Sequence, residues 1–209
     1  TLNRKIRLMN DANCFALSEA MDGAGQKFKS IFGVIIGTGF GGALSYKKEI
    51  IEGANQIAGD WGHQPLPYPT DEEIKTQINC PLMNCGRALC AEQFMSGIGF
   101  AKIFNKKNNT NFNSHEIVEL DKKDDPRAKV ELSLYEDRMA RLIAVMIGIF
   151  DPDAIIFGGG MSNIERLYKN IPLLIPKYIF SNQVKTKILK NYHGDSSGVR
   201  GAAWLWNIE

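Results

Sequence analysis

Two glycine clusters, each directly after a run of apolar residues, limit the folds open to this chain. The first is VIIGTGFGG at residues 34–42, and the second is AIIFGGGMSN at residues 154–163. Short runs rich in β-branched residues that end in turn residues predict strands. Because glycine has no Cβ atom, main-chain N–H groups at such strand ends stay open to an anion. A tight turn is the simpler interpretation of one cluster. Two clusters in the same setting favour a phosphate site, with Thr38 as an added hydroxyl donor.

The rest of the chain alternates strand-like and helix-like segments, which predicts an α/β fold. The most regular segment spans 126–150, where Leu132, Tyr135 and Met139 begin an apolar stripe at helical spacing. The Asp-Pro pair at 151–152 ends this helix. We expect strands at 6–9, 31–36, 42–47, 153–157 and 184–190, and further helices at 12–22, 91–104, 164–168 and 198–208.

Charge and hydropathy exclude several classes of partner. The formal net charge is +2 and no stripe of lysine and arginine stands out, so we expect no nucleic-acid partner. No run of about 18 apolar residues occurs, so we expect no membrane span. The first residues lack the apolar core of a secretory signal peptide. We therefore expect a cytoplasmic protein that acts on small molecules.

The MNDAN segment at residues 9–13 places an acidic residue, Asp11, between a strand-like segment and a helix. As a helix cap, Asp11 would accept hydrogen bonds from the first turn of that helix. As a general base, it would take the proton from a sugar hydroxyl that attacks a phosphorus atom. Phosphoryl transfer needs phosphate donors and one such carboxylate, and this chain offers both. The sequence leaves both roles of Asp11 open.

Three of the four cysteines, Cys80, Cys85 and Cys90, lie within eleven residues, while Cys14 stands apart. Such clustering favours a metal site over a disulfide framework. With His63 these cysteines supply one nitrogen and three thiolates, a ligand set of structural zinc sites. The alternative is an empty cluster, since cysteine is also buried as a small apolar residue. A bound zinc would tie down the irregular, proline-containing loop between His63 and Cys90.

Five segments, in their order along the chain, resemble the ROK family of sugar kinases and repressors. They are NDANCFALSEA, VIIGTGFGGAL, AGDWGHQPLP, CGRALCAEQFMSGIGF and DPDAIIFGGGMSN. The GHQPLP and CAEQFMSGIGF segments are most similar to the bacterial fructokinase and mannokinase branch. The resemblance covers essentially the whole chain and implies an actin-like ATPase (ribonuclease H-like) fold of two lobes. It also implies transfer of the ATP γ-phosphate to a hexose hydroxyl, of the fructose or mannose class, with Mg²⁺.

The same resemblance implies roles for individual residues. Asp11 would be the catalytic base. The sugar would lie against Asn10, Asp60, His63 and Glu92, the phosphates against Gly37, Thr38 and Gly39, and the adenosine beside Gly158 and Gly159. The ligands of the implied structural zinc would be His63, Cys80, Cys85 and Cys90.

Two positions in these segments depart from the family pattern. Asp60 stands where the family usually has glutamate, and the shorter side chain reaches less far. The sugar preference is therefore open. In the zinc segment, Cys85 and Cys90 keep the family spacing, but Cys80 has moved away and Met83 stands where the family has its first cysteine.

A third departure concerns the start of the chain. The family's N-terminal phosphate motif, Asp-x-Gly-Gly-Thr, does not occur before Asp11. We therefore expect residues 1–209 to form the large C-terminal lobe of a longer kinase, with the sugar-binding and adenosine-binding half. Because half of the phosphate-binding surface would be missing, we expect no appreciable turnover from this chain alone. Trp204 and Trp206, in the last helix, are expected to be partly exposed.

Two other functions remain open. ROK repressors sense a sugar through the same lobe and bind DNA through an N-terminal winged helix. A plain sugar-binding module is the third possibility. The NDAN and GTGFGG segments favour the kinase over both. ROK proteins are commonly homodimers, so the resemblance suggests a homodimer. None of the residues in this sequence indicates a dimer independently.

Overall fold

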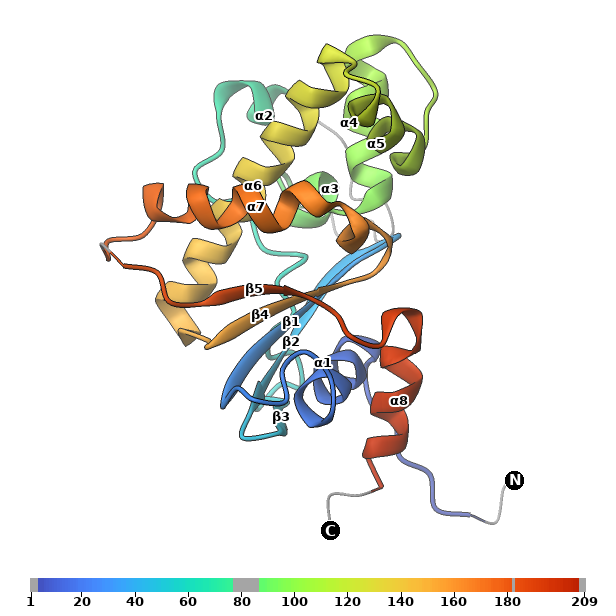
Figure 1. The fold of residues 1–209 in the computed structure, drawn as a ribbon, viewed down its shortest axis with the longest axis vertical. Coiled ribbons are helices and arrows are strands. Elements are labelled where there is room, and N and C mark those ends of the chain that lie inside the picture. The colour runs from blue at the N-terminus through green and yellow to red at the C-terminus, as the bar shows by residue number, and fades with distance from the viewer. Residues whose placement is uncertain (1–3, 77–86, 182, 207–209) are drawn as a thin grey trace.

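The computed structural model describes residues 4–76, 87–181 and 183–206. Within these ranges a five-stranded mixed sheet forms the centre, in the order β3-β2-β1-β4-β5 (Figure 1). β1 pairs antiparallel with β2 and parallel with β4. The strands are β1 (Ser30–Ile36), β2 (Phe40–Tyr46), β3 (Glu49–Ile51), β4 (Ala154–Gly158) and β5 (Lys187–Lys190).

Helices cover both faces of this sheet. Those described are α1 (Asp11–Met21), α2 (Asp71–Thr76), α3 (Ala91–Met95), α4 (Gly97–Asn108), α5 (Ser114–Lys122), α6 (Pro126–Phe150), α7 (Glu165–Leu174) and α8 (Ser197–Trp204). The predicted helix at 126–150 is confirmed in full as α6. The side chain of Asp125 accepts hydrogen bonds from its first turn, and Pro126 occupies its first position, where no N–H is needed.

Side chains of β1 alternate between two different cores, as strand geometry requires. Phe32, Val34 and Ile36 face the main core, which also contains the inner face of α6. Ile31 faces the opposite side, where it packs with residues of α1 and β4. In Figure 1 α1 and α8 therefore lie on one side of the sheet, and α3, α6 and α7 lie on the other.

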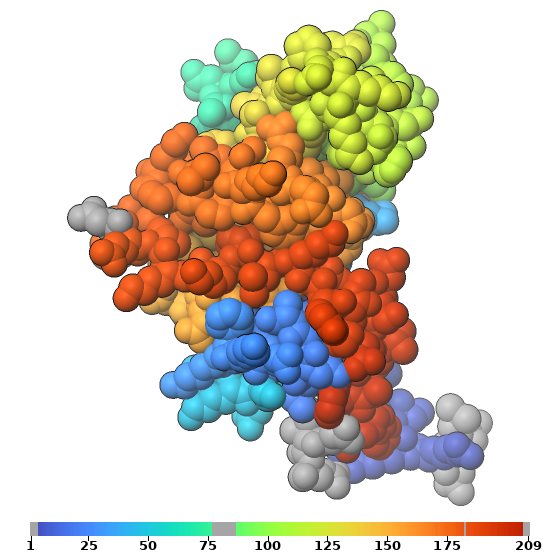
Figure 2. Space-filling view, viewed as in Figure 1, coloured from blue at the N-terminus to red at the C-terminus, as the bar shows by residue number. Residues whose placement is uncertain are grey.

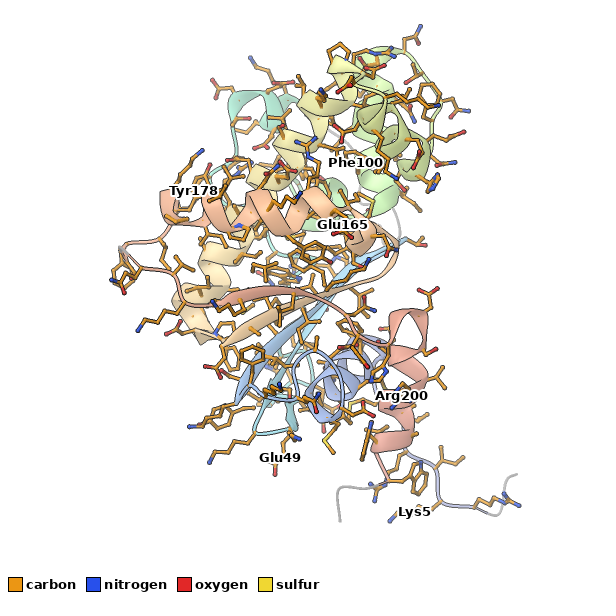
Figure 3. All side chains as sticks on the ribbon, in the orientation of Figure 1. Lys5, Glu49, Phe100, Glu165, Tyr178 and Arg200 are labelled. Atoms are coloured by element: carbon orange, nitrogen blue, oxygen red, sulfur yellow. The ribbon has the colours of Figure 1, made fainter. Side chains whose placement is uncertain are left out.

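Glycines in two strands allow α1 to approach the sheet closely. A Cβ atom on Gly158 would lie 2.4 Å from a ring carbon of Phe15, and one on Gly33 would lie 3.0 Å from the Cβ atom of Ala16. At its other side α1 packs against α8, the helix that carries Arg200 (Figure 3). Arg200 pairs with Asp22, the residue that follows α1. Close packing on α1 thus explains the first glycine after the apolar run of β4.

A buried ionic network ties α2 and the preceding loop to α6. The Glu73 carboxylate accepts hydrogen bonds from Arg138 at 2.8 Å and from Arg141 at 2.6 Å. Arg141 also donates to the carbonyl oxygens of Pro67 and Tyr68, at 2.8 and 2.7 Å. Arg138 donates in addition to Glu131 at 2.8 Å. All four charged side chains are buried, and each has a charge partner within this set.

Some expectations about the elements were wrong. Residues 6–9 form no strand, and Ile6 and Leu8 are exposed, because no described strand lies beside them to pair with. The 91–104 helix is divided at Ser96 into α3 and α4. Helix α2 was not predicted. No helix in the described ranges has the length and apolar character needed to cross a membrane.

We predict that Glu73→Gln lowers the free energy of unfolding by about 2 kcal/mol, because it removes the carboxylate that two buried guanidinium groups share. Arg138 then keeps only Glu131 as a counter-charge, and Arg141 keeps only Asp137. Urea unfolding of both proteins measures this. The control is Lys129→Ala, which removes an ion pair whose partner Asp124 is 83% exposed, and it should cost less than about 1 kcal/mol. Equal small losses in the two variants would contradict a stabilising network.

The same carboxylate gives a pH dependence. Burial raises the pKa of Glu73, but hydrogen bonds from Arg141, Thr70 and Arg138 outweigh it and lower the pKa to about 2, from an ordinary value of 4.5. The stabilisation is therefore complete above pH 4.5 and is lost as the pH falls towards 2. The wild-type advantage over Glu73→Gln should be constant above pH 4.5 and narrow below it. An advantage that stays constant in acid would contradict the assignment.

Candidate active site

The N-terminus of α1 lies at the same edge of the sheet as the first glycine cluster. Ala20, near the end of α1, packs with Ile31 at the start of β1, whereas Ala12 packs near Ile35 at its end. The helix therefore runs antiparallel to β1. Its first residues lie towards the carboxyl ends of β1 and β4, the edge at which open α/β sheets bind ligands.

Three main-chain segments meet at Gly37. The N–H group of Gly97, at the start of α4, donates to the carbonyl oxygen of Gly37 at 2.8 Å. Gly159, which follows β4, has a φ of +81°, and a Cβ atom on it would lie 2.6 Å from the carbonyl oxygen of Ile36. The two glycine clusters are thus in direct contact, and a side chain at Gly159 would separate them.

A cavity of about 740 Å³ opens beside these contacts. Its walls come from the β1–β2 turn, α4, α5 and the segment after β4, and they include Thr38, Val118 and Met161. In Figure 2 the β1–β2 turn surfaces in light blue between the green helices and the orange segment. The volume lies within the range of small-molecule sites. Gly160 lines the cavity, whereas Gly158 and Gly159 are not among its described lining residues.

The helix-cap role that the sequence offered for Asp11 is filled by its neighbour Asn10. Asn10 is the N-cap of α1, and its side-chain oxygen accepts from the N–H group of Ala12 at 2.9 Å. Asp11 is the first helical residue, and its carboxylate accepts from the same N–H group at 2.8 Å. Its side chain is exposed and is not among the described residues that line the 740 Å³ cavity. Asp11 is therefore not needed as the cap and can face a bound molecule.

The start of α3 and the loop at residues 59–64 pack against the start of β2. The Glu92 carboxylate, which is buried, accepts from the N–H group of Phe40 at 3.2 Å. The Glu92 N–H group donates to Gly62 at 2.8 Å. A Cβ atom on Gly62 would lie 1.9 Å from the Phe40 carbonyl oxygen. Glu92 and the half-buried His63 therefore belong to one packed unit, formed by the 59–64 loop and the start of α3.

Asp60 lies on the α1 side of this unit. A Cβ atom on the preceding residue, Gly59, would lie 2.8 Å from the Cα atom of Ala43 in β2. Ala43 shares a small buried cluster with Ala12 of α1. Asp60 and Asp11 thus each adjoin a residue that packs on Ala43, and both side chains are exposed.

The structure brings together two of the four expected zinc ligands. The Nδ1 atom of His63 lies 3.6 Å from the Sγ atom of Cys90. Cys80 and Cys85 lie outside the described residues. Among the residues that are described, no three histidine, cysteine, aspartate or glutamate side chains gather as a metal site.

The α4 and α5 walls of the cavity were not predicted from the sequence. Lys102, Ser114, His115 and Glu119 lie there. One signal was available. Gly97 and Gly99 weaken a predicted helix, and isolated glycines in a helix suggest a close approach of another segment.

Comparison with known proteins identifies the family. A ROK family profile matches residues 1–209. The chain belongs to the ROK family. It is 38% identical over 206 residues to an N-acetyl-D-glucosamine kinase of Vibrio atlanticus (strain LGP32), and the match covers 98% of this chain and 68% of that kinase.

Solved ROK structures have the same fold. A ROK hexokinase from Thermus thermophilus superposes with a TM-score of 0.82 at 23% identity, over 96% of this chain and 64% of that one. A ROK transcriptional regulator, a homolog of the E. coli MLC protein, superposes with a TM-score of 0.78 at 19% identity, over 95% of this chain and 51% of that one. The fold is therefore the actin-like ATPase fold of ROK proteins. The chain spans about two thirds of the length of these kinases.

Proposed function

We propose that the protein containing this chain is a sugar kinase that transfers the γ-phosphate of ATP to a hydroxyl group of a hexose. The main support is that an exposed carboxylate, Asp11, and the glycine turn with Thr38 lie at one edge of one sheet. The 38% identity to an N-acetyl-D-glucosamine kinase, over nearly the whole chain, supports the same class.

In the proposed reaction the oxygen of the sugar hydroxyl attacks the γ-phosphorus atom, and Asp11 accepts the proton of that hydroxyl. The bond between the γ-phosphorus atom and the β-phosphate oxygen breaks, and ADP leaves. Main-chain N–H groups at Thr38 and Gly39 would stabilise the charge on the phosphates, with the Thr38 hydroxyl as a further donor. The Gly37 N–H group closes the turn by donating to the Gly39 carbonyl oxygen at 3.0 Å, so Gly37 would lie beside the phosphates without donating to them. Asn10 fixes the direction of α1 and hence the position of Asp11. Asp60, His63 and Glu92 would orient the sugar.

The cavity fits a nucleotide. Its apolar wall can hold a base, and its glycine edge can hold phosphates. We propose that the adenosine lies against the segment after β4, beside Gly159 and Gly160, with Gly158 serving to pack α1. Mg²⁺ usually enters such sites with the phosphates and keeps few protein ligands. The lack of a gathered ligand cluster among the described residues is compatible with that, and Mg²⁺ would neutralise phosphate charge.

We propose N-acetyl-D-glucosamine as the first substrate to test, because the relative at 38% identity is named for it. The fructose or mannose preference expected from the sequence remains the alternative. Asp60, in place of the glutamate typical of the family, would face the sugar with a shorter side chain in either case.

A second candidate is a sugar-sensing repressor, since the chain superposes on a ROK transcriptional regulator as well as on kinases. A shared fold does not separate these functions. The exposed Asp11 favours the kinase, because sugar sensing needs no proton acceptor.

We also propose that His63, Cys80, Cys85 and Cys90 bind a structural zinc. A tetrahedral zinc with bonds of about 2.0 Å to nitrogen and about 2.3 Å to sulfur places such a pair about 3.5 Å apart. The separation between His63 Nδ1 and Cys90 Sγ, 3.6 Å, agrees with this. The metal would hold the 59–64 loop against the segment that begins α3 and would take no part in the reaction.

We predict that Asp11→Asn lowers kcat at least about 10³-fold on the best sugar of a panel containing N-acetyl-D-glucosamine, fructose and mannose, because the general base is lost. A coupled assay of ADP release measures this, and urea unfolding should be unchanged. The control is Asp71→Asn, the exposed first residue of α2, which should keep full activity. Near wild-type turnover in Asp11→Asn would contradict the assignment, and no turnover on any sugar in the wild type would contradict the kinase.

We predict about one zinc per chain in protein purified without chelator. Cys90→Ser should lose most of the zinc. The control is Cys14→Ser, in α1, where the side chain is buried against Leu205, and this variant should keep the zinc. Elemental analysis measures both. Well under one equivalent of zinc in the wild type would contradict the zinc site.

A further inference from the structure

Helix α4 begins at the glycine turn and forms one wall of the cavity. Its first N–H group is bonded to Gly37, and the helix then runs along the cavity wall. Ile98 and Lys102 both line the cavity, and residues four apart lie on the same face of a helix. Lys102 therefore stands about one helical turn beyond Ile98, on the wall that begins at the glycine turn.

The other charged groups of the cavity have partners. The Lys122 ammonium group pairs with the Glu119 carboxylate at 2.7 Å. The Asn105 side chain is also engaged, since it donates to the Phe112 carbonyl oxygen at 2.7 Å and accepts from Phe112 and Thr110.

Lys102 differs from its neighbours on α4. Lys106 donates to the carbonyl oxygen of Thr76, and Lys107 pairs with Glu72 and Glu131. Within the part of the chain that the structure describes, Lys102 forms neither a hydrogen bond nor an ion pair, and its side chain lines the cavity. The described cavity wall thus holds one unpaired positive charge, with His115 counted as neutral.

We propose that Lys102 binds the phosphates of the nucleotide. The inference rests on the proposed function and adds a binding residue to it. Cα–Cβ bonds in a helix tilt towards the N-terminus, so the Lys102 side chain leans towards Gly37 and Thr38 rather than away from them. Three other lining residues, Val118, Met161 and Ile164, are apolar and suit a base.

The glycine turn and Lys102 would bind the phosphates in two different ways. Main-chain N–H groups of the glycine turn contribute fixed partial charges, and Lys102 contributes a full charge on a flexible chain. An unpaired ammonium group favours the triphosphate over the uncharged nucleoside. Lys102 should therefore control affinity for charged nucleotides and have little effect on adenosine or on the sugar.

The test is calorimetric titration of the whole protein that contains this chain with ATP, ADP and adenosine, at low ionic strength. Lys102→Gln should raise the Kd for ATP about five- to tenfold and leave the Kd for adenosine within about twofold. Lys102→Arg should restore most of the ATP affinity. Lys106→Gln, on the same helix but bonded to Thr76, is the matched control and should bind ATP like the wild type. Added salt should shrink the difference between wild type and Lys102→Gln.

The outcomes distinguish the two proposals. ATP affinity unchanged in Lys102→Gln, or adenosine affinity lowered as much as ATP affinity, would overturn the role of Lys102 and leave the kinase proposal standing. A wild-type protein that binds neither ATP nor ADP would overturn the kinase proposal together with this one.

Discussion

The candidate site depends on one close contact, the hydrogen bond from the Gly97 N–H group to the Gly37 carbonyl oxygen at 2.8 Å. It joins the strand turn that offers N–H groups to a helix that forms a cavity wall. Gly159 packs against the same turn, where a Cβ atom would not fit. Three bare main-chain segments can meet there only because glycines occupy the contact points. The cavity beside them follows from this meeting.

Packing further away keeps this contact in place. Glu92 holds the start of β2 through Phe40, while α1 reaches the sheet through Gly33 and Gly158. The buried charges around Glu73 fix the loop that follows the 59–64 segment onto α6. The site therefore consists of loops and helix ends on a rigid sheet, which is where α/β proteins usually place binding residues.

Much of this was readable from sequence because it depends on local pattern. The apolar stripe predicted α6 to the residue, and glycines after apolar runs predicted the turn at Thr38. Other features depend on partners far away in sequence. Glu73 is bonded to Arg138 and Arg141, which lie 65 and 68 positions away in sequence. Lys102 stands out only because its neighbours are paired. Two of the predicted zinc ligands lie outside the described residues.

Amide hydrogen exchange at the glycine contact tests the central claim most directly. ATP added to the whole protein should slow exchange in residues 37–39 and 97–101, since bound phosphates would cover the N–H groups of Thr38 and Gly39 and fix the turn and the start of α4. Exchange in α8, away from the cavity, should change little. Unchanged exchange at 37–39 in ATP-saturated protein would contradict an anion site at this edge of the sheet.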